Sequence, residues 1–163
     1  MKKSIQLLAF LCTCGTIFSQ QKLHDGIYLV DQNASSKHAS SQPNRTMVQF
    51  NPGFVNEDPE SYSPLIIQTD NYFSFDLAGQ PYIQTQSNQD KMLFLQLTES
   101  AKEKLRLFTS SNLMKDIAVV VNDQVLVMYK ITSPVTGGLI KITKCDGQAC
   151  KQILKNIKGS GKI

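Results

Sequence analysis

Two cysteines, Cys145 and Cys150, are the side chains of this chain best suited to covalent chemistry. In an oxidising compartment, an even pair of cysteines at short separation is typical of a structural disulfide. The alternatives are free thiols, a metal pair or a redox pair. A zinc site needs further His or Cys ligands, which are not found nearby in the sequence, and the spacing is not the Cys-x-x-Cys of redox proteins. The pattern therefore favours a disulfide.

No catalytic set stands out among the other side chains. The two histidines, His24 and His38, lie near no candidate nucleophile in the sequence. The chain contains no Gly-x-Ser-x-Gly motif, no His-x-x-x-His pair and no phosphate-binding glycine loop. Carboxylates that are distant in sequence, such as Asp76 and Asp123, can still be brought together by a fold. We therefore predict a protein that is not an enzyme, with no catalytic residue and no cofactor.

An acidic loop and a glycine pair are two further candidate sites. Glu57, Asp58 and Glu60 offer the oxygen ligands that calcium requires, but a solvated acidic loop is the simpler interpretation, and no metal site is predicted. Gly137 and Gly138 lie in a polar loop, where such a pair usually serves a left-handed or closely packed turn. The alternative is a hinge or a polypeptide-contact loop.

The start of the chain has the pattern of a bacterial export signal. Lys2 and Lys3 precede a mostly apolar run over residues 5–18, which is too short to span a bilayer, and cleavage is expected between Ser19 and Gln20. The mature protein is therefore predicted to be periplasmic or secreted. Lipidation at Cys14 stays open, although the residue before it is a poor match to a lipoprotein signal.

Length and charge narrow the class of protein. The chain has 163 residues and a formal net charge of +4. Two lysines would be removed with the signal, which leaves a charge of +2 on the predicted mature chain. A nearly neutral mature chain makes nucleic acid an unlikely partner, and no second apolar stretch is long enough for a transmembrane segment. The predicted division is a signal peptide over 1–19, an N-terminal strand and polar loop over 20–45, one domain over 46–157 and a frayed tail over 158–163.

The elements that would position these residues can be read from the periodicity. Residues 72–77 alternate between polar and apolar side chains, which indicates a half-buried strand, whereas the apolar run over 117–121 indicates a buried one. Asn122-Asp123 predicts a tight turn to a partner strand over 124–131. Other strands are expected at 26–31, 46–50, 64–69, 82–85, 92–97 and 139–143.

Two amphipathic helices complete the pattern. Leu97, Ala101, Leu105 and Phe108 recur at helical spacing after a cap at Thr98 or Ser100. A last helix follows Asp146, with an apolar stripe formed by Ala149, Cys150, Ile153, Leu154 and Ile157. Because strands come in runs rather than alternating with helices, the predicted class is α+β, a mainly antiparallel sheet with two amphipathic helices packed on one face.

Residues 91–157 resemble the head of the first periplasmic domain of SecD, a subunit of the bacterial protein-export machinery. The shared features are a helix opening at Thr98-Glu99-Ser100-Ala101, a strand over 117–121, a tight turn, and a Val135-Thr136-Gly137-Gly138 step before Ile142-Thr143 and a final helix. Asn122-Asp123 replaces the acidic-Gly turn of the family, and the cysteine pair has no expected counterpart.

The resemblance implies an exported, non-catalytic binding module that contacts extended or unfolded polypeptide or an envelope protein. SecD itself uses membrane helices to couple a proton gradient to export, and this chain shows none after its signal. Strand addition to an exposed sheet edge is the expected mode of binding a polypeptide. The alternative is a small secreted hydrolase or hydrolase inhibitor with an unrecognised site.

Overall fold

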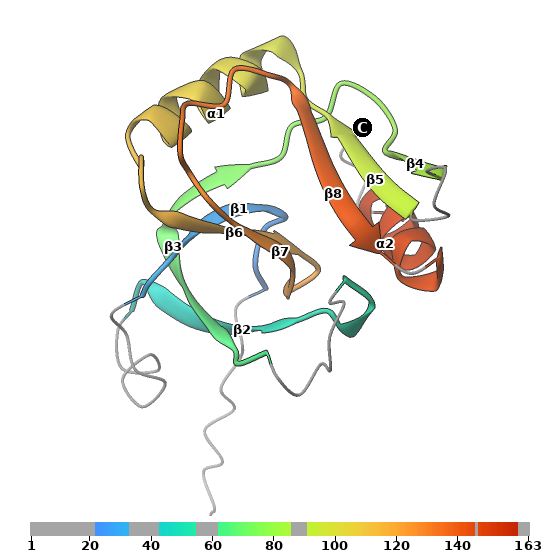
Figure 1. Cartoon of the computed structure of the whole chain (residues 1–163), viewed down its shortest axis with the longest axis horizontal. Coiled ribbons are helices and arrows are strands. Elements are labelled where there is room, and N and C mark those ends of the chain that lie inside the picture. The colour runs from blue at the N-terminus through green and yellow to red at the C-terminus, as the bar shows by residue number, and fades with distance from the viewer. Residues whose placement is uncertain (1–21, 33–42, 55–61, 86–90, 146, 160–163) are drawn as a thin grey trace, which may run out of the picture.

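The computed structural model describes residues 22–32, 43–54, 62–85, 91–145 and 147–159 (Figure 1). The predicted signal, the acidic loop at Glu57, Asp58 and Glu60, and His38 lie outside these residues. The strands are β1 (Gly26–Val30), β2 (Arg45–Phe50), β3 (Leu65–Ser74), β4 (Tyr82–Thr85), β5 (Lys91–Gln96), β6 (Asp116–Val121), β7 (Gln124–Lys130) and β8 (Leu139–Cys145). The helices are η2 (Pro52–Phe54), α1 (Glu99–Ser110) and α2 (Gly147–Gly159).

Five strands close a small barrel in the order β1-β3-β2-β7-β6. Neighbouring strands are antiparallel except β2 and β7, which pair in parallel through Gln49–Gln124 and Phe50–Val125. The barrel has its own apolar cluster, formed by Tyr28, Val48, Ile67, Ala118, Val120 and Val125. β1, which the sequence assigned to a separate N-terminal region, lies between β3 and β6 in this barrel.

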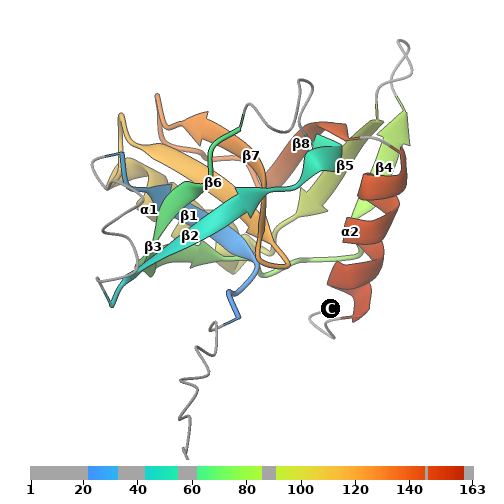
Figure 2. The same ribbon diagram turned by 90° about the horizontal axis from the view of Figure 1, so that it is seen from below.

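The remaining strands form a separate antiparallel sheet in the order β4-β5-β8 (Figure 2). A second and larger cluster joins this sheet to the barrel, since Leu93 and Ile142 of the sheet share it with Val119 of β6. β6 therefore buries both of its faces, one in each cluster. This is the physical reason why the structure has two β-units instead of the single sheet that the sequence predicted.

Both helices pack through the apolar residues that the sequence indicated, and α1 begins at its predicted cap, whereas Asp146, the cap predicted for α2, lies outside the described residues. Thr98 caps α1, and its Oγ1 accepts a hydrogen bond from the backbone N–H of Ala101 at 3.2 Å. Leu105 of α1 and Ile153 of α2 are each 1% exposed and belong to the same cluster. However, α1 contacts β3 of the barrel, whereas α2 contacts β4, β5 and η2. The helices thus cover different β-units, which differs from the expected shared face of one sheet.

A tight turn and a close approach between two backbones accompany the strand pairing. Asn122 and Asp123 have φ values of 51° and 60°, as expected for a two-residue turn between antiparallel strands. At Gly26 the backbone of β1 approaches β3 so closely that an added Cβ would overlap the carbonyl oxygen of Phe73. Of the helices in the described ranges, none has the length and apolar character that crossing a bilayer requires.

Candidate binding surface

The side chains with catalytic potential serve the fold. His24 stacks on Tyr72 with 6.1 Å between ring centroids. Asp76 accepts a hydrogen bond from Thr98 Oγ1 at 2.8 Å, and Asp123 accepts one from the backbone N–H of Leu23 at 2.7 Å. The described ranges contain no group of three His, Cys, Asp or Glu side chains that could hold a metal ion. The Asp76 carboxylate therefore holds the side chain of the residue that caps α1, and the Asp123 carboxylate holds the backbone at Leu23.

Tyr28 is the titratable side chain most changed by its surroundings. It is 1% exposed, stacks on Tyr72 at 4.8 Å, and donates a hydrogen bond from its hydroxyl to the carbonyl oxygen of His24 at 2.6 Å. Burial raises the pKa of the Tyr28 phenol, because the phenolate would lose its hydration, and the nearby Tyr72 acts in the same direction. This phenol stays neutral, and its ring belongs to the apolar cluster of the barrel.

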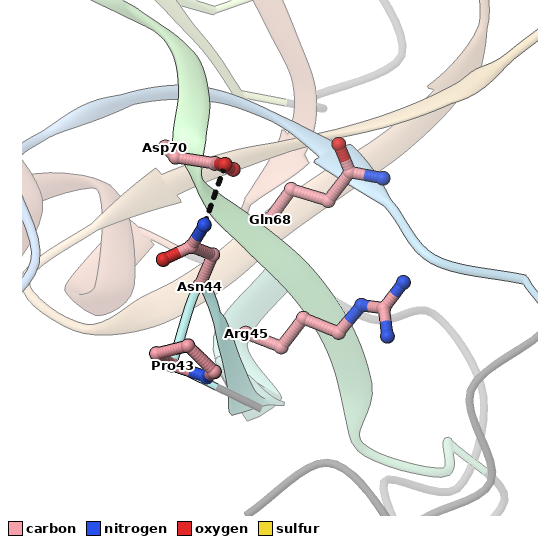
Figure 3. Close-up of a pocket in the computed structure, with 5 residues that line it drawn as sticks. All are labelled: Pro43, Asn44, Arg45, Gln68 and Asp70. Atoms are coloured by element: carbon pink, nitrogen blue, oxygen red, sulfur yellow. Dashed lines mark hydrogen bonds between the residues drawn. The ribbon is translucent and has the colours of Figure 1, made fainter. Parts of the chain in front are cut away.

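A shallow polar pocket of about 310 Å³ lies where β2 meets β3 (Figure 3). It is lined by Pro43, Asn44, Arg45, Gln68 and Asp70. Across it, Asn44 Nδ2 donates a hydrogen bond to Asp70 Oδ2 at 2.9 Å. Arg45 Nε lies 2.5 Å from a carboxylate oxygen of Asp31, whose side chain is 6% exposed. The polar groups thus hold the strands together, and we assign the pocket no ligand.

The predicted disulfide is present between Cys145 and Cys150, with 5.6 Å between their Cα atoms. It joins the last residue of β8 to the first turns of α2. Both cysteines are buried in the cluster between the sheet and the barrel, and Cys145 Sγ lies 3.7 Å from the carbonyl oxygen of Lys91. The bridge therefore acts as a structural clamp at the start of α2.

The glycine pair differs from its predicted role in one respect. Neither Gly137 nor Gly138 adopts the left-handed backbone that was one of the two expected reasons for the pair. Gly138 is closely packed, because an added Cβ would overlap the aliphatic stem of Lys102, and its carbonyl oxygen accepts a hydrogen bond from Leu97 N–H at 2.7 Å. Gly137 has open space around it. A role of the pair in polypeptide contact stays a prediction.

The three-stranded sheet has two edge strands, β4 and β8, because β5 lies between them. In the barrel, every strand has a neighbour on both sides. The sheet places Leu93 and Ile142 in the cluster shared with the barrel, and residues of the alternate register point to the opposite face. On that outer face Tyr82 stacks on Phe94 at 5.0 Å and is 48% exposed.

The edge strands could not be located from the sequence. A strand's periodicity reports which side chains are buried but not which neighbour its backbone pairs with. The lysine in the middle of β8 was one available signal, because lysines often protect an edge from unwanted pairing. Lys141 is exposed in the structure.

Comparison with known proteins finds a likeness in fold. No protein-family model matches the chain, and no curated protein matches it. A solved structure described as "Structure and function of a membrane component SecDF that enhances protein export" superposes with a TM-score of 0.51 at 15% sequence identity. The match covers 79% of this chain and 59% of that chain.

A second structure, "Crystal structure of SecDF in Super-membrane-facing form", also gives a TM-score of 0.51, at 17% identity, and the match covers 79% of this chain and 18% of that one. This chain thus spans only part of the length of both proteins. The likeness extends beyond residues 91–157, to which the sequence resemblance was confined. The expected resemblance is confirmed, and the chain has the fold of a SecD periplasmic segment.

Proposed function

We propose that this chain is an exported, non-catalytic binding module that contacts extended polypeptide or an envelope partner. The observation that supports the proposal most directly is the likeness over 79% of the chain to SecDF, a membrane component described as enhancing protein export. The buried Cys145–Cys150 bridge fits an oxidising, extracytoplasmic location. A periplasmic or secreted location after cleavage near Ser19-Gln20 is part of the proposal.

Extended polypeptide is the partner that the architecture suits best. An open sheet edge binds main chain, which every unfolded segment offers, and needs few specific side-chain pockets. The polar pocket at β2 and β3 is occupied by its own ion pair and hydrogen bond, so it is less suited to a small ligand. Binding of this kind is expected to favour unfolded over folded chains of the same sequence.

The proposal is tested with purified residues 20–163 and one protein in two states. Reduced, carboxymethylated α-lactalbumin is permanently unfolded, and native α-lactalbumin is its folded counterpart. We expect saturable binding of the unfolded form, measured by biolayer interferometry, and at least about tenfold weaker binding of the folded form. Equal binding of both forms, or of neither, would show that the chain does not recognise extended polypeptide.

The partner in the cell is tested separately by crosslinking. A photoreactive amino acid at the exposed position of Leu139 is expected to capture protein in the native envelope, whereas the same group at exposed Thr85 on the opposite sheet edge serves as the matched control. Mass spectrometry of the captured material also reads the N-terminus of the mature chain. Retention of residues 1–19 would contradict the proposed export.

A further inference from the structure

Among the described residues, no strand lies beside the outer edge of β8. β8 has seven residues and pairs with β5 on one side, and no other described strand pairs with it. β4, the other edge of the same sheet, has only four residues and is contacted by α2, whereas β8 is contacted by the short helix η2. β8 therefore offers the longer edge to an incoming chain.

The direction of each backbone group in β8 follows from two hydrogen bonds. Leu97 N–H donates to the carbonyl oxygen of Gly138 at 2.7 Å, on the side of β5. Backbone groups of successive residues in an antiparallel strand face opposite edges. Ile140 therefore faces β5, whereas Leu139 and Lys141 face outward. The hydroxyl of Tyr129 agrees with this alternation. It comes from β7, outside the three-stranded sheet, and donates a hydrogen bond to the carbonyl oxygen of Lys141 at 3.2 Å, so this carbonyl faces away from β5.

We propose that the outer edge of β8, centred on Leu139 and Lys141, is the docking strand for an extended polypeptide segment that carries an acidic residue. This inference rests on the proposed function and names its surface and its partner. The incoming segment adds a fourth strand beside β8 and pairs with the outward N–H and C=O groups of these two residues. The closed barrel offers no comparable strand.

Side chains at the edge define the chemistry of the segment. Leu139 is 45% exposed and Lys141 is exposed, and both lie on the outer face of the sheet together with Phe94, the register partner of Lys141. An acidic residue opposite Lys141 and apolar residues beside Leu139 complement this edge. A second copy of the chain fits less well, because two β8 strands paired about Lys141 would place like charges opposite each other.

Tyr129 controls access to the edge. Its hydroxyl occupies the carbonyl oxygen of Lys141, which is one of the acceptors that an incoming strand needs. The segment must displace this hydroxyl before it completes its hydrogen bonds. Tyr129→Phe keeps the ring and removes the competing donor, so we expect this variant to bind the segment about two- to tenfold more tightly, as for one neutral hydrogen bond.

The experiment measures binding of a fluorescein-labelled peptide, Val-Thr-Glu-Thr-Val-Thr-Thr, to residues 20–163 by fluorescence anisotropy. With Glu opposite Lys141, this peptide places a valine beside Leu139 in either strand direction. Lys141→Pro removes an outward N–H without removing a hydrogen bond to β5, so β8 itself should persist. Thr85→Pro is the matched control, because register with β5 also points its N–H outward, but from the opposite edge. We expect Lys141→Pro to weaken binding at least tenfold and Thr85→Pro to leave it unchanged.

Two further measurements keep the inference testable if Lys141→Pro fails to fold. Lys141→Glu should weaken binding of the Glu peptide and restore it for the same peptide with Lys in place of Glu. Hydrogen exchange should show new protection of the Leu139 and Lys141 amides when peptide is bound, because these N–H groups then pair with the segment.

The outcomes separate this inference from the function on which it rests. Equal loss in the Lys141→Pro and Thr85→Pro variants, or no charge-swap rescue, would overturn β8 as the docking strand while binding of unfolded α-lactalbumin persists. Failure of the wild-type chain to bind either peptide or unfolded protein would instead overturn the proposed function. A concentration-dependent dimer in sedimentation that is lost in Lys141→Pro would assign the edge to a second copy and overturn the peptide.

Discussion

Removal of the Cys145–Cys150 disulfide should loosen α2 and lower the stability of the whole domain. The bridge joins residues five apart in sequence. In the chain-entropy description, a closed loop of this size lowers the conformational entropy of the unfolded chain and raises its free energy by about 2 kcal/mol at 25 °C. Replacement of both cysteines by alanine keeps small apolar side chains at two buried positions. We therefore expect a loss of about 2 kcal/mol, or roughly 7 °C in Tm for a domain of this size.

The assay is urea unfolding followed by circular dichroism at 222 nm, since the chain contains no tryptophan to report by fluorescence. Reduction of the wild-type protein should give the same midpoint shift as the double alanine variant. Ile153→Ala is the matched perturbation of α2 that leaves the bridge in place. Because the Ile153 side chain is fully buried, its truncation should lower the free energy of unfolding by about 2–5 kcal/mol.

A combined variant tests the reasoning more sharply. If the bridge acts by seating α2 against the sheet, loss of the bridge and of the Ile153 side chain should not add, because both perturb the same helix. Hydrogen exchange should place the first effect of reduction in α2 and not in the barrel. A loss below about 0.5 kcal/mol in both the reduced and the alanine forms would refute the clamp.

Three other perturbations follow from the coordinates. Gly26→Ala should cost about 1–3 kcal/mol in urea unfolding because its Cβ would overlap the Phe73 carbonyl, whereas Gly137→Ala, with open space, should be close to neutral. Met114→Asn should raise stability by up to about 1 kcal/mol, because Met114 is 67% exposed at φ 65° and asparagine tolerates this backbone better; a loss of stability would contradict that view. Because burial raises the pKa of Tyr28, the neutral phenol favours the folded state. This stabilisation is complete below the unfolded-state pKa of about 10 and is lost as the pH rises above it. The free energy of unfolding of Tyr28→Phe should therefore change less with pH between pH 9 and 11 than that of the wild-type protein.

Local features of the fold were predictable because short-range chemistry determines them. Thr98 caps α1 through its own hydroxyl, and Asn122 and Asp123 take the left-handed backbone that their turn requires. The Cys145–Cys150 bridge was predicted from two cysteines at short separation in a chain that was expected to be exported. Each of these residues meets its partner within a few positions along the chain.

The proposed binding surface was not predictable in the same way. The sequence suggested Gly137 and Gly138 as a contact loop, but Gly138 is packed against Lys102 and accepts a hydrogen bond from Leu97. Lys141 in the middle of β8 was one available signal of an edge, but it does not show which strands pair with β8. That property depends on which strand is absent from its outer side.

The sequence by itself determined the α+β class, the two apolar helix stripes, the disulfide and the likeness to SecD. Only the tertiary structure decided that five strands close a barrel, that β1 belongs to it, and that β8 is an edge strand of the three-stranded sheet. The physical reason lies in β6, where Val119 and Val120 are both fully buried, in different clusters. An apolar run shows that two faces must be covered, but which distant segments cover them depends on contacts made across the whole folded chain.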